Sequence, residues 1–323
     1  MRSLKQDQLQ LSDKMKNIKM KRTLILFFAI CFIGVLKAQQ LPQITQYMTN
    51  NYVINPAIAG MYDYYQVNTT IRNQWAGINQ GPRTSVISIY GKHRDNIGLG
   101  GTVYNDVTGP TSRAGGSLSY TYAFQVIKEI KLSLALQGGF TQFKIIKDNI
   151  SVKDQNDPLM QGGNVVRVLP DATFGLNLSG KKWYIGAAIP QLLSSELKLM
   201  DDDFARIYDT TSQNGKLASH LYVLGSYSYD INSSISIEPS FFLKSTTGAK
   251  TQIDLGVKST YREMIWVGMN YKINNNLSPL AALLGYSIND RFNIGYAYGM
   301  PSSNTSSYYS GSHEFMLGIK FPY

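Results

Sequence analysis

Cysteine and histidine are scarce in this sequence, and their scarcity excludes several kinds of site. The 323 residues include one cysteine, Cys31, and three histidines, His93, His220 and His313. A single thiol cannot build a disulfide framework or a thiolate metal centre. The three histidines are spread over the chain without the spacing of zinc ligands. We therefore expect no metal site and no bound cofactor.

The sequence also lacks an apolar segment long enough to cross a membrane as a helix. The apolar run 24–36 would rise about 20 Å as a helix, against a hydrocarbon core of about 30 Å. A basic stretch precedes this run and Ala38 follows it, which is the order of parts in a secretory signal peptide. We predict a signal peptide at 1–38, cleaved after Ala38, with Met15 as an alternative start of translation.

An excess of basic residues is confined mainly to this leader. The formal net charge is +10, and residues 1–38 hold eight Lys or Arg against two Asp. The rest of the chain therefore has 23 basic and 19 acidic residues. Such a nearly balanced remainder does not form a nucleic-acid patch. We expect no nucleic-acid partner.

What the sequence has in abundance is alternation of apolar and polar residues from residue 64 onward. In the last segment, Phe315, Leu317 and Ile319 share one face, while Glu314 and Lys320 share the other. A period of two residues is typical of β-strands. The pattern predicts an all-β fold of about 14 antiparallel strands, at 64–75, 83–91, 96–105, 113–126, 130–146, 169–179, 182–193, 218–230, 235–246, 250–261, 263–273, 277–288, 292–299 and 312–322.

Loop lengths separate the two architectures that alternation leaves open, a soluble sandwich and a membrane barrel. If the chain enters the barrel on the periplasmic side, the even connections are tight, as at 126–130 and 180–181. The long connections, 147–168, 194–217 and 300–311, are all odd and would face the outside. Short turns on one rim, long loops on the other and an even strand number are typical of outer-membrane barrels.

These patterns together predict the organisation of the chain. A cleaved signal peptide at 1–38 precedes an N-terminal segment at 39–63, which is periplasmic or lumenal. A transmembrane outer-membrane β-barrel follows at 64–323, with membrane lipid around it. Lipid offers no hydrogen-bond partner, so the strands must close into a barrel that leaves no unpaired edge.

Two sets of strand residues have expected places in such a barrel. Aromatic residues near strand ends are expected to form girdles at the membrane interfaces; they are Tyr64, Tyr65, Trp75, Tyr120, Tyr122, Trp183, Tyr184, Tyr227, Tyr229, Tyr296 and Tyr298. The opposite face is expected to line the lumen with small and charged residues; they are Gly98, Gly100, Gly256, Gly268, Gly295, Gly318, Asp254, Lys258, Glu238, Lys244, Glu314 and Lys320. Such a lumen could conduct, hold a plug or be closed by ion pairs.

Candidate catalytic and ion-binding groups have simpler explanations. Ser310, Ser312 and His313 could belong to a barrel hydrolase, but a histidine between small residues at a strand end needs no such role. The consecutive acids at 201–203 lack the alternate spacing of a calcium loop. The glycines at 98–101 lie within a strand and open no helix, so they are not a nucleotide fingerprint. We predict that the protein is not an enzyme.

Two motifs near the start of the predicted barrel carry a specific resemblance. Residues 46–60 read QYMTNNYVINPAIAG, and residues 72–78 read RNQWAGI. They resemble the QYM…INPAYAG and RxQWxGI elements of the PorP/SprF family of type IX secretion membrane proteins. The terminal 312–314 segment is also similar to the family ending. Ile58 departs from the family pattern, where an aromatic residue is common.

The resemblance implies a non-enzymatic component of type IX secretion or gliding machinery. Its implied partners are other type IX secretion components and a secreted surface protein with a C-terminal sorting domain, such as an adhesin. Two alternatives remain open, a passive channel for small or hydrophobic solutes and the barrel hydrolase. The motif residues are the candidates for partner binding: Asn55, Pro56, Gly60, Arg72, Gln74, Trp75 and Gly77.

The motif residues also have a structural interpretation. Asn55-Pro56 fixes an extended residue before a locked φ, and Gly60 permits a positive φ, so the segment is expected to form a rigid bend. Arg72 and Trp75 are expected near the outer end of the first strand. They would form either a surface recognition patch or a lumenal arginine beside an interfacial tryptophan.

Overall fold

The computed structural model describes residues 43–147, 150, 163–197 and 215–322. The predicted signal peptide, the acids at 201–203 and much of two long connections lie outside these residues. Within them, no helix is both long and apolar enough to cross a membrane. Two short 3-10 turns, η1 (Asn51–Val53) and η2 (Pro56–Gly60), precede the first strand.

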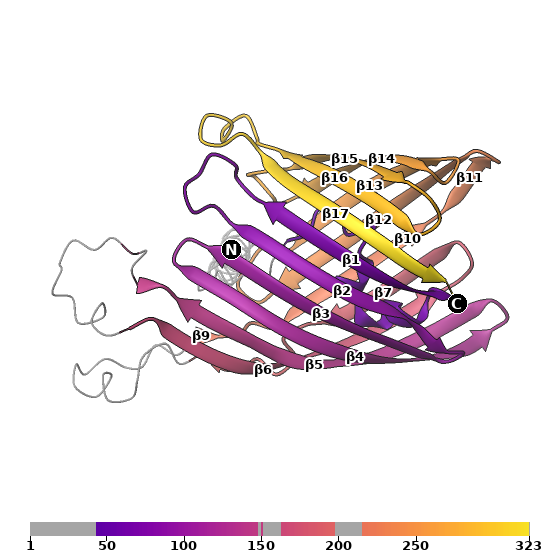
Figure 1. The fold of residues 1–323 in the computed structure, drawn as a ribbon, viewed down its shortest axis with the longest axis horizontal. Helices are drawn as coiled ribbons and strands as arrows, with labels where there is room; N and C mark the ends of the chain where they lie inside the picture. Colours follow the sequence, from indigo (N-terminus) through magenta and orange to yellow (C-terminus); the bar gives the residue numbers. More distant parts are fainter. Residues whose placement is uncertain (1–42, 148–149, 151–162, 198–214, 323) are drawn as a thin grey trace, which may run out of the picture. The chain divides into compact units, whose positions relative to one another are not determined.

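The barrel is one antiparallel sheet in which almost every strand pairs with its neighbour in sequence. Figure 1 shows the last strand, β17, beside the first, β1, so these two strands pair in the wall. The strands are β1 (Tyr64–Asn73), β2 (Arg83–Arg94), β3 (Ile97–Thr108), β4 (Thr111–Ile127), β5 (Ile130–Ile145), β6 (Val165–Ser179), β7 (Trp183–Ile189), β10 (His220–Tyr227), β11 (Tyr229–Asn232), β12 (Ile235–Thr246), β13 (Gln252–Tyr261), β14 (Ile265–Ile273), β15 (Leu280–Ser287), β16 (Phe292–Met300) and β17 (Ser312–Pro322).

The predicted strand number is confirmed, although one strand is broken. Strands β10 and β11 are separated at Ser228, and both pair with β12. They are two parts of one predicted strand, so fourteen strands form the wall. The pairings β7–β10 and β10–β12 close the sheet, which leaves no edge to be solvated in the membrane.

The alternation places apolar side chains outside and polar or small ones inside. In β17, Phe315 and Phe321 are exposed outward, whereas Glu314, Met316 and Gly318 are buried inward. The outward residues lie in contact with lipid, so their exposure to solvent in an isolated chain is expected. Two aromatic residues assigned to the girdles, Tyr64 and Tyr184, instead face the lumen. Lys320 lies over the Tyr64 ring, and Tyr184 accepts a hydrogen bond from the lumenal Asn51.

The strand ends differ from the prediction at the long-loop rim. Strand β1 ends at Asn73 and β7 at Ile189, because Trp75 and Gln191 adopt positive φ values that end an extended strand. Two further strands, β8 (Glu196–Leu197) and β9 (Gly215–Lys216), form a separate two-stranded sheet that alternation did not predict. The opposite rim has only tight turns, as at 95–96, 128–129 and 233–234.

Candidate functional site

The segment before β1, residues 43–62, lies inside the barrel and is called here the lumenal segment. It contacts wall strands around the barrel, including β2, β4, β6, β12, β14 and β17. Its end nearest β1 lies at the short-turn rim, where Asp63 accepts a hydrogen bond from Lys92 at 2.8 Å. That bond lowers the pKa of the Asp63 carboxyl. The sequence left a plugged lumen as one of three alternatives, and the structure has the plugged form.

The INPAIAG motif gives this segment its shape. Asn55 is extended, its side-chain oxygen accepts a hydrogen bond from the Ala57 backbone N–H at 3.0 Å, and Pro56 starts η2. This is the arrangement of an N-cap followed by proline at the first helical position. Gly60 has no positive φ, contrary to the expectation from sequence. Its backbone instead lies close to the wall, because a Cβ on Gly98 would approach Gly60 N to 2.5 Å.

The QYM end of the segment is held by a buried ion pair. Arg72 Nη1 lies 3.0 Å from Glu314 Oε2, and both side chains are almost fully buried. Glu314 also accepts hydrogen bonds from the backbone N–H groups of Thr45 and Gln46, at 2.7 and 2.8 Å. Arg72 donates to the Thr45 hydroxyl as well. A buried carboxylate needs such donors, because its desolvation would otherwise be costly.

Other wall strands contact the middle of the lumenal segment. Tyr52 stacks on Tyr90 with ring centroids 4.3 Å apart, and its hydroxyl lies 2.8 Å from Ser119 Oγ. Burial raises the pKa of the Tyr52 phenol to about 12, so it stays neutral at physiological pH. Asn270 donates to the Thr45 carbonyl at 2.7 Å. These bonds satisfy polar groups that the segment, lacking a strand partner, could not pair by itself.

Glycines on the inner face make room for the lumenal segment. A Cβ at each of several wall positions would lie within 2.6 Å of a segment atom. The wall glycines and the residues they accommodate are Gly98 with Gly60, Gly100 with Tyr52, Gly175 and Gly186 with Asn55, Gly256 with Met48, and Gly295 with Gln46. Four of the lumenal glycines predicted from sequence, Gly98, Gly100, Gly256 and Gly295, therefore permit close approach of a second chain segment.

The structure divides the candidate motif residues into two groups. Asn55, Pro56, Gly60 and Arg72 lie in the lumen, where all are buried. Gln74, Trp75 and Gly77 lie in the first connection of the long-loop rim; Trp75 packs against Tyr309 with centroids 6.4 Å apart, and Gly77 has a φ of +101°. Arg72 is therefore the lumenal arginine of the two alternatives, not a residue displayed on the surface.

Several residues that hold the lumenal segment were not singled out from the sequence. Thr45, Ser119 and Asn270 look like ordinary polar residues in the sequence, whereas Glu314 was expected to face the lumen. Inward-facing glycines opposite a proline motif were the one available signal. The pairing could not be read from them, because the partners lie as many as 269 residues apart in sequence.

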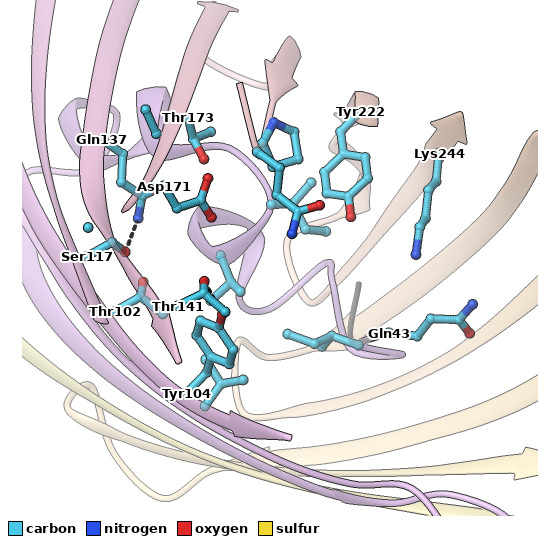
Figure 2. Close-up of a pocket in the computed structure, with 18 of the residues that line it drawn as sticks. Gln43, Thr102, Tyr104, Ser117, Gln137, Thr141, Asp171, Thr173, Tyr222 and Lys244 are labelled. Atoms are coloured by element: carbon cyan, nitrogen blue, oxygen red, sulfur yellow. Dashed lines mark hydrogen bonds between the residues drawn. The ribbon is translucent and has the colours of Figure 1, made fainter. Parts of the chain in front are cut away.

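A cavity of about 150 Å³ lies beside the lumenal segment (Figure 2). Its floor includes Val53 and Ile54 of the segment, and its wall includes Gln191 and Gln252 near the long-loop rim. Hydroxyl, amide and aromatic side chains line it, with Asp171 and Lys244 as its labelled charged residues in Figure 2. The other labelled residues are Gln43, Thr102, Tyr104, Ser117, Gln137, Thr141, Thr173 and Tyr222.

The serines weighed as parts of a hydrolase bond other groups than His313, and the Ser310 hydroxyl donates to Ala76 O. Ser312 faces inward and accepts a hydrogen bond from Trp75 N, whereas the next residue, His313, faces outward and bonds Tyr296. Adjacent strand residues point to opposite faces, so this serine and histidine cannot form a nucleophile–base pair. No cluster of three metal-ligating side chains occurs in the described part of the chain.

Comparison with known proteins supplies the family. The model of the type IX secretion system membrane protein PorP/SprF matches residues 36–319. The chain belongs to the PorP/SprF family. The resemblance to the family is thereby confirmed; the first motif lies within the lumenal segment, and Arg72 of the second motif bonds it. No curated protein matches the sequence.

Solved structures similar to this PorP/SprF chain are outer-membrane barrels. The Ralstonia pickettii toluene transporter TbuX is 11% identical, with a TM-score of 0.50 over 84% of this chain and 93% of that one. A Pseudomonas aeruginosa FadL homologue is 12% identical, with a TM-score of 0.45 over 88% of this chain and 95% of that one. At this identity TbuX shows the fold alone. The PorP/SprF chain is a closed barrel located in the outer membrane.

Proposed function

We propose that this PorP/SprF protein is a non-enzymatic component of type IX secretion or gliding machinery that helps secrete or anchor a surface partner such as an adhesin. The observation that supports this most is the lumenal segment. The family motif occupies the lumen, so this barrel serves as a scaffold. Its function is then carried by the loops at its rims. The partner would carry a C-terminal sorting domain and meet other type IX secretion components at the barrel.

The long-loop rim supports this proposal with an ordered surface. Ala76 N donates to Gly311 O and Ser310 N to Ala76 O, both at 2.8 Å, which ties the 74–82 and 301–311 connections together. Tyr308 is 74% exposed next to this pair of connections. Exposed aromatic residues on ordered loops are typical anchors of protein interfaces.

Deletion of the gene tests the proposed function. The exported partner should be lost from the cell surface, and the wild-type gene should restore it. Tyr308→Ser should then lower display by tenfold or more while the barrel stays abundant, since this side chain has no role in the wall. Trp75→Ala is the informative comparison: if barrel abundance falls before display does, Trp75 supports the fold and not the partner.

A passive channel is the second candidate, because the lumen keeps a cavity next to the segment. A channel needs a continuous path, and the lumenal segment occupies part of the lumen, where it bonds β4, β6 and β12. Normal display of every secreted protein in the deletion strain, together with reduced uptake of a small solute, would favour the channel instead.

A further inference from the structure

Asp171 is a carboxylate on β6 that faces the cavity beside the lumenal segment. Among the described residues, no cation and no side-chain donor binds the Asp171 carboxyl. Other lumenal acids have a counter-charge: Glu314 pairs with Arg72 at 3.0 Å, and Glu238 pairs with Lys258 at 2.7 Å. Asp254 and Asp106 accept side-chain hydrogen bonds from Gln252 and Thr84.

The carboxylate points into the cavity beside the lumenal segment (Figure 2). A partly buried charge without a counter-charge is costly, so an ionisable residue within a membrane barrel indicates a function whose partner is absent. Asp171 contributes nothing to holding the lumenal segment, since no described residue of that segment bonds it. The cavity therefore lies beside a carboxylate that has no counter-charge among the described residues.

Strand register explains why the cavity lies next to this carboxylate. Asp171 pairs with Gly139, Gly139 with Ser117, and Ser117 with Thr102, so three small residues continue its row across the wall. Gly139 must remain small, because a Cβ there would lie 2.1 Å from Gly116 O. The resulting space of about 150 Å³ equals roughly five water molecules.

Hydroxyl groups complete the surroundings. Thr102, Ser117, Thr141 and Thr173 line the cavity together with Tyr104, whose hydroxyl lies 2.7 Å from Thr141 Oγ1. A carboxylate among several acceptors, each able to bond one N–H, matches a compact ammonium group with three donors. A planar guanidinium, in contrast, binds best to a bidentate carboxylate in a flat slot. Hydroxyl groups arranged around a small cavity do not form such a slot.

We propose that this cavity binds one primary ammonium group on a flexible chain, a lysine side chain, with Asp171 as its counter-charge. Asp254 and Lys244 also line the cavity and carry opposite charges, so Asp171 leaves one net negative charge there and a single ammonium is selected over a polyamine. This inference rests on the proposed function for the source of the lysine. The cavity lies between the lumenal segment and the long-loop rim, so a flexible segment of the exported partner supplies it from that side.

Binding is tested on the full barrel in detergent with Nα-acetyl-lysine methylamide as the probe. Its neutral counterpart, Nα-acetyl-norleucine methylamide, is the matched control ligand. Saturable binding of the lysine probe alone is expected by calorimetry, weakened tenfold or more by Asp171→Asn. Asp230→Asn removes an exposed carboxylate paired with Lys182 at the short-turn rim and should leave binding unchanged.

Three results would overturn the site. They are no saturable binding to the wild-type barrel, equal binding of the neutral probe, and an Asp171→Asn barrel that binds like the wild type. Binding that appears only after deletion of residues 39–42 would also overturn it, because the cavity would then belong to this chain's own N-terminal segment. Heat-modifiable migration of each variant shows that the barrel is folded.

Display of the partner in cells separates this inference from the proposed function. Asp171→Asn should reduce display while Asp230→Asn does not. If gene deletion abolishes display but Asp171→Asn leaves it intact, the partner is not the source of the lysine and the proposed function stands. If deletion leaves display intact while the probe still requires Asp171, the proposed function fails and the ammonium site stands.

Discussion

The lumenal segment and the barrel wall differ in how their backbone N–H and C=O groups are hydrogen-bonded. The wall pairs strand with strand, as in the unbroken ten-residue register between β1 and β17. The segment of 43–62 has no strand partner and depends on single side chains of the wall, such as Glu314 and Asn270. Wall stability is therefore spread over many similar bonds, whereas the segment is held by a few buried ones. Single substitutions should release the segment and leave the wall closed.

The largest effect is expected for Glu314→Gln. The change leaves Arg72 buried without a counter-charge and weakens the acceptor for the backbone N–H groups of Thr45 and Gln46. Removing one partner of a buried pair costs about 3–5 kcal/mol. Hydrogen exchange at residues 45–60 should rise sharply, while exchange in the wall strands stays slow. Equal loss of protection in the wall would mean that segment and wall unfold together.

A smaller effect is expected for Gly98→Ala. The new Cβ would lie 2.5 Å from the backbone of Gly60, so the segment must shift at a cost of about 1–3 kcal/mol. Gly138→Ala is the matched control, because nothing lies within 4 Å of a Cβ at that outward position. Protease cleavage near η2 should increase only in Gly98→Ala. Unchanged cleavage would show that the contact between glycine and segment is not tight.

Asn55→Ala should cost about 1–2 kcal/mol, since it removes the cap of η2 and a hydrogen bond to Leu176 O at 2.9 Å. Asn275→Ala removes a similar cap in an exposed turn, where water replaces the lost bond. Exchange of the Ala57 amide reports the first change and exchange of the Leu277 amide the second. A larger effect in the exposed turn would contradict the importance of burial in the lumen.

The smallest effect is expected for Glu129→Gln at the short-turn rim. Glu129 pairs with Lys181 at 2.8 Å, but both side chains are at least half exposed. Exposed ion pairs contribute about 0–1 kcal/mol and are screened by salt. Unfolding of the barrel in urea should keep its midpoint within experimental error. A shift as large as that of Glu314→Gln would remove the distinction between lumenal and surface ion pairs.

The sequence by itself determined the number of strands in the barrel wall and which side chains face inward. A period of two residues assigns every second side chain to one face, and the parity of loop lengths requires a closed even-stranded barrel. These are local properties, so strand number and inward-facing residues such as Glu314 and Gly98 could be predicted. Strand ends at Asn73 and Ile189 and the break at Ser228 could not, because single backbone conformations decide them.

Only the tertiary structure decided what fills the barrel. The sequence indicated that 46–60 is a rigid motif and that the lumen has small and charged residues, without connecting the two. The connection depends on contacts between residues far apart in the chain, as Tyr47 with Ser240 and Asn55 with Leu176. No local pattern encodes such pairs, because they arise when closure of the sheet brings distant strands around one lumen. The empty space beside Asp171 has the same origin, a row of small residues drawn from three neighbouring strands, β3, β4 and β5.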